Sequence, residues 1–154
     1  MKKLAIIIML TFFGLTTQAQ ELKWHTDISE ATKIALDENK PLFLFFTGSD
    51  WCGWCIKLQK EVFQKPEFAK WATENVVLVE LDYPKRKQLP TELQQQNAQM
   101  QQMFQVTGFP TIWFVKPVKQ EGKKVNLDEL GKTGYVPGGP EAWIKVADAI
   151  LKKQ

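Results

Sequence analysis

The feature that most constrains the fold is a short apolar run that leads through a turn into a pair of cysteines. Five apolar residues, Leu42–Phe46, follow Pro41 and precede Thr-Gly-Ser. Their brevity and aromatic content predict a strand that is buried on both faces of a sheet. Cys52 and Cys55 come next and open a helical stretch to about Phe63. Because such a strand must be covered on both sides, the chain needs helices on two faces of one sheet.

The rest of the chain alternates between strand patterns and helix patterns. We expect helices at about 27–39, 52–63, 66–75, 91–105 and from 139 onward, and strands at about 21–26, 42–46, 76–81, 107–115 and 125–135. Thr91 is expected to cap the fourth helix, and the core stripe of that helix is expected to consist of Leu93, Met100, Met103 and Phe104. The order predicts an α/β fold with a central mixed sheet and helices on both faces.

Residues 1–19 have the three parts of a secretory signal peptide. Two lysines come first, an apolar run covers Leu4–Leu15, and the small residues Thr17 and Ala19 stand at positions −3 and −1 of a cleavage site before Gln20. The apolar run is about 12 residues long, whereas a membrane span needs roughly 18 or more. The sequence therefore predicts export to the periplasm, cleavage, and a single domain at 20–154 without stable membrane insertion.

The net charge of the chain bears on which kinds of partner it could bind. The chain has 154 residues, 44% of them hydrophobic, and a net charge of +3. Cleavage would remove Lys2 and Lys3 and leave a net charge of about +1, which gives no reason to expect nucleic acid as a partner. We expect a monomer.

The cysteine spacing points to redox chemistry. Cys52 falls at a helix N-terminus, where the helix dipole favours a thiolate and lowers the pKa of a thiol. Cys55 lies one turn further on and can resolve a mixed disulfide formed on Cys52. Zinc needs four ligands, and one CxxC with the single histidine His25 does not supply them, so no metal is expected. A structural disulfide stays open as an alternative, although so short a loop would stabilise the fold only weakly.

Two motifs resemble the thioredoxin-like thiol:disulfide oxidoreductases. They are Trp51-Cys52-Gly53-Trp54-Cys55 and Gly108-Phe109-Pro110-Thr111. Trp24, Lys40-Pro41 and Leu81-Asp82 make the chain similar to the exported bacterial branch related to the C-terminal domain of DsbD. The resemblance implies a thioredoxin-like fold and disulfide exchange with protein substrates. It also implies a cis Pro110 beside the dithiol, and a substrate groove that includes Phe109 and Thr111.

The resemblance also suggests roles for other side chains. Both tryptophans are candidates for substrate contact; we expect Trp51 to be mainly structural and Trp54 to meet partners. Thioredoxins carry a buried aspartate six residues before the first cysteine, but Phe46 stands here. Glu80 or Asp82, on the next strand, could replace it as proton acceptor for the second cysteine. The alternatives are that Glu80 faces solvent and that water accepts the proton.

The direction of electron flow stays open at this point. No histidine lies between the cysteines, which favours a reductant. A disulfide oxidase or isomerase, and a non-catalytic binding or folding module with a structural CxxC, are the alternatives. No nucleotide, flavin or metal cofactor is implied, and the resemblance implies a membrane thiol-redox partner. Lys57 and the run Lys85–Lys87 are expected to be solvated side chains.

Overall fold

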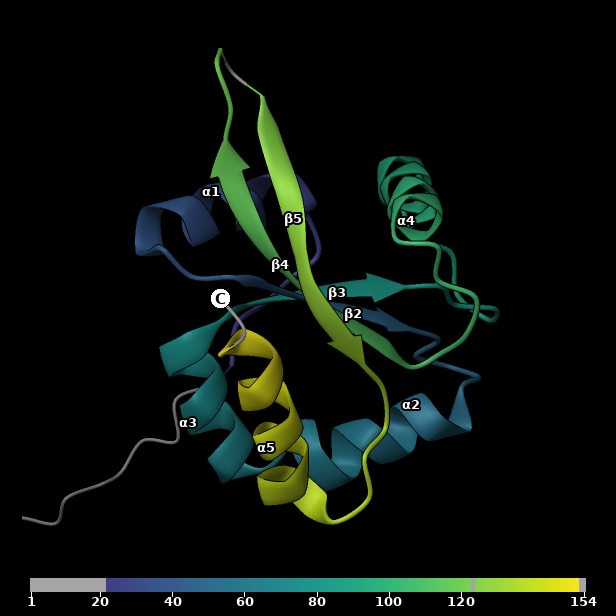
Figure 1. Ribbon diagram of the computed structural model, residues 1–154. Coiled ribbons are helices and arrows are strands. Elements are labelled where there is room, and N and C mark those ends of the chain that lie inside the picture. The colour runs from purple at the N-terminus through teal and green to yellow at the C-terminus, as the bar shows by residue number, and fades with distance from the viewer. Residues whose placement is uncertain (1–21, 123, 153–154) are drawn as a thin grey trace, which may run out of the picture.

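The computed structural model describes residues 22–122 and 124–152 (Figure 1), so the expected signal segment lies outside the described part. Five strands, five α-helices and one π-helical segment follow one another in the predicted order. They are β1 (Trp24–His25), α1 (Ile28–Glu38), β2 (Leu42–Thr47), α2 (Gly53–Leu58), η1 (Gln59–Phe63), α3 (Pro66–Asn75), β3 (Val77–Asp82), α4 (Thr91–Met103), β4 (Thr111–Lys119), β5 (Val125–Thr133) and α5 (Gly139–Leu151).

The strands form one mixed sheet with the order β1-β3-β2-β4-β5. The pairs β1–β3 and β3–β2 are parallel, whereas β2–β4 and β4–β5 are antiparallel. All six residues of the central strand β2 are buried, which confirms the strand predicted from its apolar run. In the part of the chain that is described, no helix is long and apolar enough to cross a membrane.

The side chains of β2 point alternately into two separate hydrophobic cores, one on each face of the sheet. Phe43 and Phe45 pack with residues of α2, α3 and α5 on one face, and Leu42, Leu44 and Phe46 pack with residues of α1 and α4 on the other. Figure 1 shows these helices on opposite sides of the sheet. Trp143 of α5 is fully buried beside Phe43, at 5.7 Å between ring centroids. The predicted α/β architecture, with helices on both faces, is confirmed.

Local signals explain most helix boundaries, but not all. The Asp27 carboxylate accepts hydrogen bonds from the backbone N–H groups of Ser29 and Glu30, at 2.7 and 3.1 Å, and so begins α1. The expected Thr91 cap is wrong, because α4 follows Pro90 and has no side-chain cap.

Two further expectations for the helices need correction. Met103 is 60% exposed, so its place in the core stripe of α4 is wrong. The helix buries Asn97 and Met100, and Phe104, the residue after its end, is buried as well. The stretch after the cysteines also changes to a π-helical turn at Gln59–Phe63, which its apolar spacing did not predict.

The register of the sheet brings three loops to one end. Thr47 lies opposite Asp82, and Phe46 lies opposite Thr111. The ends of β2 and β3 and the start of β4 are therefore neighbours. The loops at 48–52, 83–90 and 108–110 meet there, and they carry the residues that the sequence analysis singled out.

Candidate functional site

The two cysteines form a disulfide at the start of α2. Cys52 is the N-cap residue, and the backbone N–H of Cys55 donates a hydrogen bond to its Sγ at 3.2 Å. Cys55 is fully buried, while Cys52 keeps 6% of its surface exposed. An incoming thiol or disulfide can therefore reach Cys52 only.

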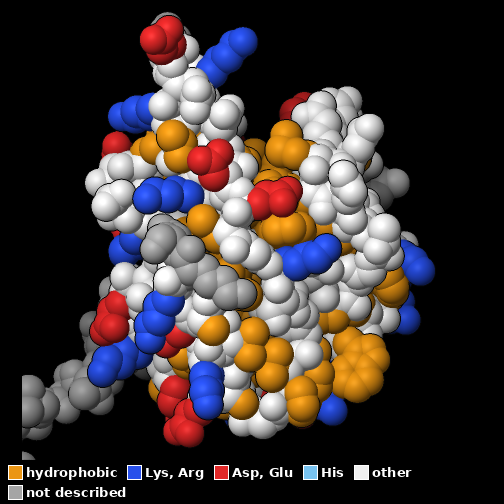
Figure 2. Space-filling view, viewed as in Figure 1, with side chains coloured by type: hydrophobic (Ala, Val, Ile, Leu, Met, Phe, Trp, Pro, Cys, Tyr) orange, Lys and Arg blue, Asp and Glu red, His pale blue; other side chains and the backbone are white. Residues whose placement is uncertain are grey.

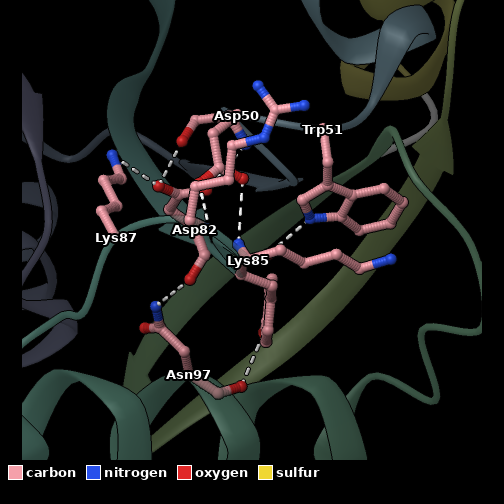
Figure 3. Close-up of polar contacts among 9 residues, drawn as sticks. Asp50, Trp51, Asp82, Lys85, Lys87 and Asn97 are labelled. Carbon is pink, nitrogen blue, oxygen red and sulfur yellow. Dashed lines mark hydrogen bonds and ion pairs between the residues drawn. The ribbon is translucent and has the colours of Figure 1, made fainter.

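The turn before Cys52 is built on Gly48. Its carbonyl accepts the N–H of Cys52 at 2.8 Å. The Trp51 ring lies against Gly48 so closely that an added Cβ would come within 2.6 Å of the indole Nε1. That nitrogen donates to the carbonyl of Tyr83 at 2.8 Å (Figure 3). Trp51 thus anchors the turn, although 37% of its surface stays exposed.

Asp82 ties the end of β3 to the same turn. Its carboxylate accepts the backbone N–H of Ser49 at 2.9 Å and the Ser49 hydroxyl at 2.6 Å. The Lys87 ammonium lies 2.9 Å from Oδ2, the oxygen that also accepts the Ser49 hydroxyl, and its hydrogen bond to Asp82 raises the pKa of Lys87. Asn97 of α4 donates to the Asp82 carbonyl at 2.9 Å. The Asp82 carboxylate is therefore already occupied in holding the loop (Figure 3).

Asp50, in the turn before Cys52, binds the loop that follows β3. Its carboxylate accepts the backbone N–H groups of Lys85 and Arg86 at 2.9 and 2.7 Å, and these bonds, that of Lys85 first, lower the pKa of Asp50. The side chains of Lys85–Lys87 are all exposed, as expected, but the run also has fixed contacts. The backbone of the run is fixed by Asp50 and its last side chain by Asp82.

The third loop contains the expected cis peptide bond, between Phe109 and Pro110. The half-buried Phe109 ring stacks on Tyr83, with 5.1 Å between centroids, and meets Trp51 edge-on at 5.9 Å. The Thr111 hydroxyl donates to the carbonyl of Gly108 at 2.8 Å and so closes the turn. One aromatic cluster therefore joins all three loops.

Glu80 faces the cysteine side of the sheet. Side chains alternate along β3, and Leu78, two residues earlier, packs in the same core as Cys55. Burial, followed by the charge of Asp82, raises the pKa of Glu80. Thr47 continues the face of Phe45, and its buried hydroxyl has no hydrogen-bond partner among the described residues. A carboxyl group and an unpaired hydroxyl thus lie on the face that carries Cys55.

Trp54 is the most exposed of the site aromatics, at 57%. Its ring lies 5.1 Å from that of Tyr135, and the Lys57 ammonium lies 5.0 and 5.1 Å from the two centroids. The Tyr135 hydroxyl donates to Glu61 at 2.5 Å, which raises the pKa of Tyr135. Exposed hydrophobic side chains gather at the α2 end of the molecule with basic side chains beside them (Figure 2). Tyr135 was not expected here, because an aromatic residue at the end of a predicted strand, about eighty residues from Trp54, gives no local signal of this contact.

The family follows from a direct comparison with known proteins. The thioredoxin-like domain family matches residues 28–147. This chain belongs to that family. Over 134 residues it is 37% identical to the disulfide bond reductase DsbH of Chlamydia pneumoniae, covering 87% of this chain and 75% of the relative.

Solved structures agree with the family assignment. A structure named DsbH oxidoreductase superposes with a TM-score of 0.76 at 34% identity and covers 86% of both chains. The oxidised C-terminal domain of DsbD from Neisseria meningitidis shares the fold, with a TM-score of 0.53 and 18% sequence identity. The superposition covers 82% of this chain and 98% of that domain. The predicted membership in the thioredoxin-like disulfide oxidoreductases is confirmed. Among residues 22–122 and 124–152, no group of three or more His, Cys, Asp or Glu could hold a metal ion.

Proposed function

We propose that this chain is an exported thiol:disulfide oxidoreductase that reduces disulfides in protein substrates. The observation that carries the exchange chemistry, as distinct from its direction, is the placement of Cys52, with its sulfur at a helix N-terminus and within 3.2 Å of the Cys55 N–H. An N–H donor and the positive end of a helix stabilise a thiolate more than a thiol. The reductive direction is supported by the relative that is named a disulfide bond reductase.

The reaction consumes the reduced dithiol. The Cys52 thiolate attacks one sulfur of a substrate disulfide, which forms a mixed disulfide and releases the other substrate sulfur as a thiolate. The Cys55 thiolate then attacks Cys52 Sγ, releases the second substrate thiol and closes the Cys52–Cys55 disulfide. Two electrons pass to the substrate, and a partner dithiol must return them, which we assign to a membrane thiol-redox protein.

The second step requires Cys55 to lose its proton, although it is fully buried. We assign the acceptor role to Glu80, because it faces the cysteine side of the sheet. Its raised pKa is also closer to the pKa of a thiol than the pKa of an ordinary carboxyl is. The contacts of Asp82 favour a loop-holding role for that residue instead.

The substrate segment would bind beside Cys52, against Trp51, Trp54 and the loop Phe109–Thr111. This assignment rests on the exposure of the two tryptophans and on the sheet register, which brings that loop to the end of β2. Export rests on the composition of residues 1–19. The mass of the protein recovered from the periplasm tests it, because cleavage before Gln20 fixes the mass of the product.

The decisive experiment measures the reduction potential of the cysteine pair. The purified protein is equilibrated with glutathione buffers, and the fluorescence of the neighbouring tryptophans reports the change. A value near or below about −230 mV supports a reductant, whereas a value near about −120 mV would make the protein a disulfide donor. Cys55→Ser should accumulate a mixed disulfide with substrate and Cys52→Ser should not. Absence of turnover together with an ordinary Cys52 pKa, near about 8.5, would leave a structural disulfide in a binding module.

A further inference from the structure

Each tryptophan beside the disulfide has a lysine over its ring. The Lys85 ammonium lies 4.0 Å from the Trp51 ring, and the Lys57 ammonium lies 5.0 Å from the Trp54 ring. Figure 3 shows the Lys85 side chain running alongside the indole. A cation within about 6 Å of a ring centroid is attracted to the ring. The two cations come from different parts of the chain, namely α2 and the loop after β3, yet they flank the same pair of cysteines.

The charge of Lys85 is available to a partner. Its ammonium makes no ion pair with any described residue, and its side chain is exposed. Asp50 lies in the neighbouring turn, but its carboxylate is occupied by the backbone N–H groups of Lys85 and Arg86. The exposed Arg86 adds a further positive charge to this loop, whereas Lys87 is neutralised by Asp82.

The charge of Lys57 is only loosely compensated. Its ammonium lies 3.9 Å from Glu61, at the outer limit of an ion pair, and Lys57 and Glu61 are 45% and 43% exposed. Glu61 also accepts the Tyr135 hydroxyl at 2.5 Å, so its charge is shared with a second donor. An exposed, shared pair of this kind is weak and is easily exchanged for a carboxylate that a partner brings.

We propose that Lys57 and Lys85 select clients whose reactive cysteine is flanked by acidic residues. The proposal rests on the proposed function and names its substrate class. An acidic client places carboxylates beside the two ammonium groups while they stay on their rings. A purely apolar client would have to displace both cations before it could cover the ring faces, and a basic client would be repelled. Charges at the edge of a binding site act mainly on the association rate and on its salt dependence.

The test compares two disulfide peptides of identical length, one with aspartates beside the cysteine and one with lysines. The rate of their reduction by the reduced protein is followed through tryptophan fluorescence. At low salt the acidic peptide should react faster, by about two- to fivefold for each lysine. At roughly 1 M salt, where the Debye length falls to about 3 Å, the preference should largely disappear. Rates with the small neutral disulfide of 2-mercaptoethanol normalise for any change in thiolate reactivity.

Variants identify the residues responsible. Lys57→Gln and Lys85→Gln should each reduce the preference, and the double variant should abolish it while keeping the rate with the neutral disulfide. Lys70→Gln, which removes an exposed lysine on α3, is the matched control and should keep the full preference. An unchanged preference in the double variant, or faster reduction of the basic peptide, would overturn the proposal. If no disulfide is reduced, the neutral one included, the proposed function itself fails.

Discussion

The Asp82 contacts allow a quantitative prediction for Asp82→Asn. The carboxylate is 8% exposed and receives two hydrogen bonds from Ser49 and one ion pair from Lys87. An asparagine keeps one acceptor oxygen but turns an N–H₂ group toward the remaining donors. A hydrogen bond to a charged group contributes about 1.5–3 kcal/mol, and the half-exposed Lys87 at most about 1 kcal/mol. We expect the free energy of unfolding to fall by about 2–4 kcal/mol.

The measurement is urea unfolding followed by fluorescence, with Lys87→Gln as the matched control. For a domain of this size, a loss of that magnitude lowers Tm by roughly 5–15 °C. Lys87→Gln removes only the ion pair, since Ser49 still donates to the carboxylate, and should cost less than about 1 kcal/mol. Equal losses in the two variants would show that the ion pair, and not the Ser49 bonds, stabilises the turn, and the reasoning would then be refuted. The rate of disulfide exchange should also change in Asp82→Asn, because Ser49 lies three residues before Cys52.

Three further substitutions test other parts of the argument. Glu80→Gln should slow turnover but raise the free energy of unfolding at pH 7. The reason is that a carboxyl whose pKa is raised on folding opposes folding once the pH exceeds its unfolded pKa. The unfolding curves of variant and wild type should therefore converge near pH 4. Trp143→Leu, in the core on the cysteine side, should cost about 2–4 kcal/mol in urea unfolding, and a loss below about 1 kcal/mol would contradict its full burial. Gly48→Ala should displace the Trp51 ring and shift its fluorescence emission, since the new Cβ would overlap the indole; an unchanged spectrum would argue against that contact.

Sequence reasoning predicted the elements whose signals are local. The apolar run of β2 and the Pro66 start of α3 each rest on residues adjacent in the chain, and the structure places them as expected. The family resemblance carried by two short motifs implied the cis Phe109–Pro110 bond, and the structure contains it together with the Cys52–Cys55 disulfide.

The parts that sequence reasoning missed depend on contacts between distant residues. Asp82 meets Ser49 across 33 positions, and no pattern near either residue indicates that pairing. The partnership of Trp54 with Tyr135 has the same origin. The π-helical turn at Gln59–Phe63 was missed because a single inserted residue does not alter the apolar spacing enough to be recognised.

The aromatic cluster of Trp51, Tyr83 and Phe109 has a thermodynamic consequence for encounter with a client. These rings, together with the bonds of Asp50 and Asp82, hold three loops in one arrangement before any partner arrives. The loops therefore lose their conformational entropy during folding, and binding a client does not require that loss again. Docking should leave the backbone of the free protein nearly unchanged, and the heat capacity change of binding should reflect only the surface that the client covers.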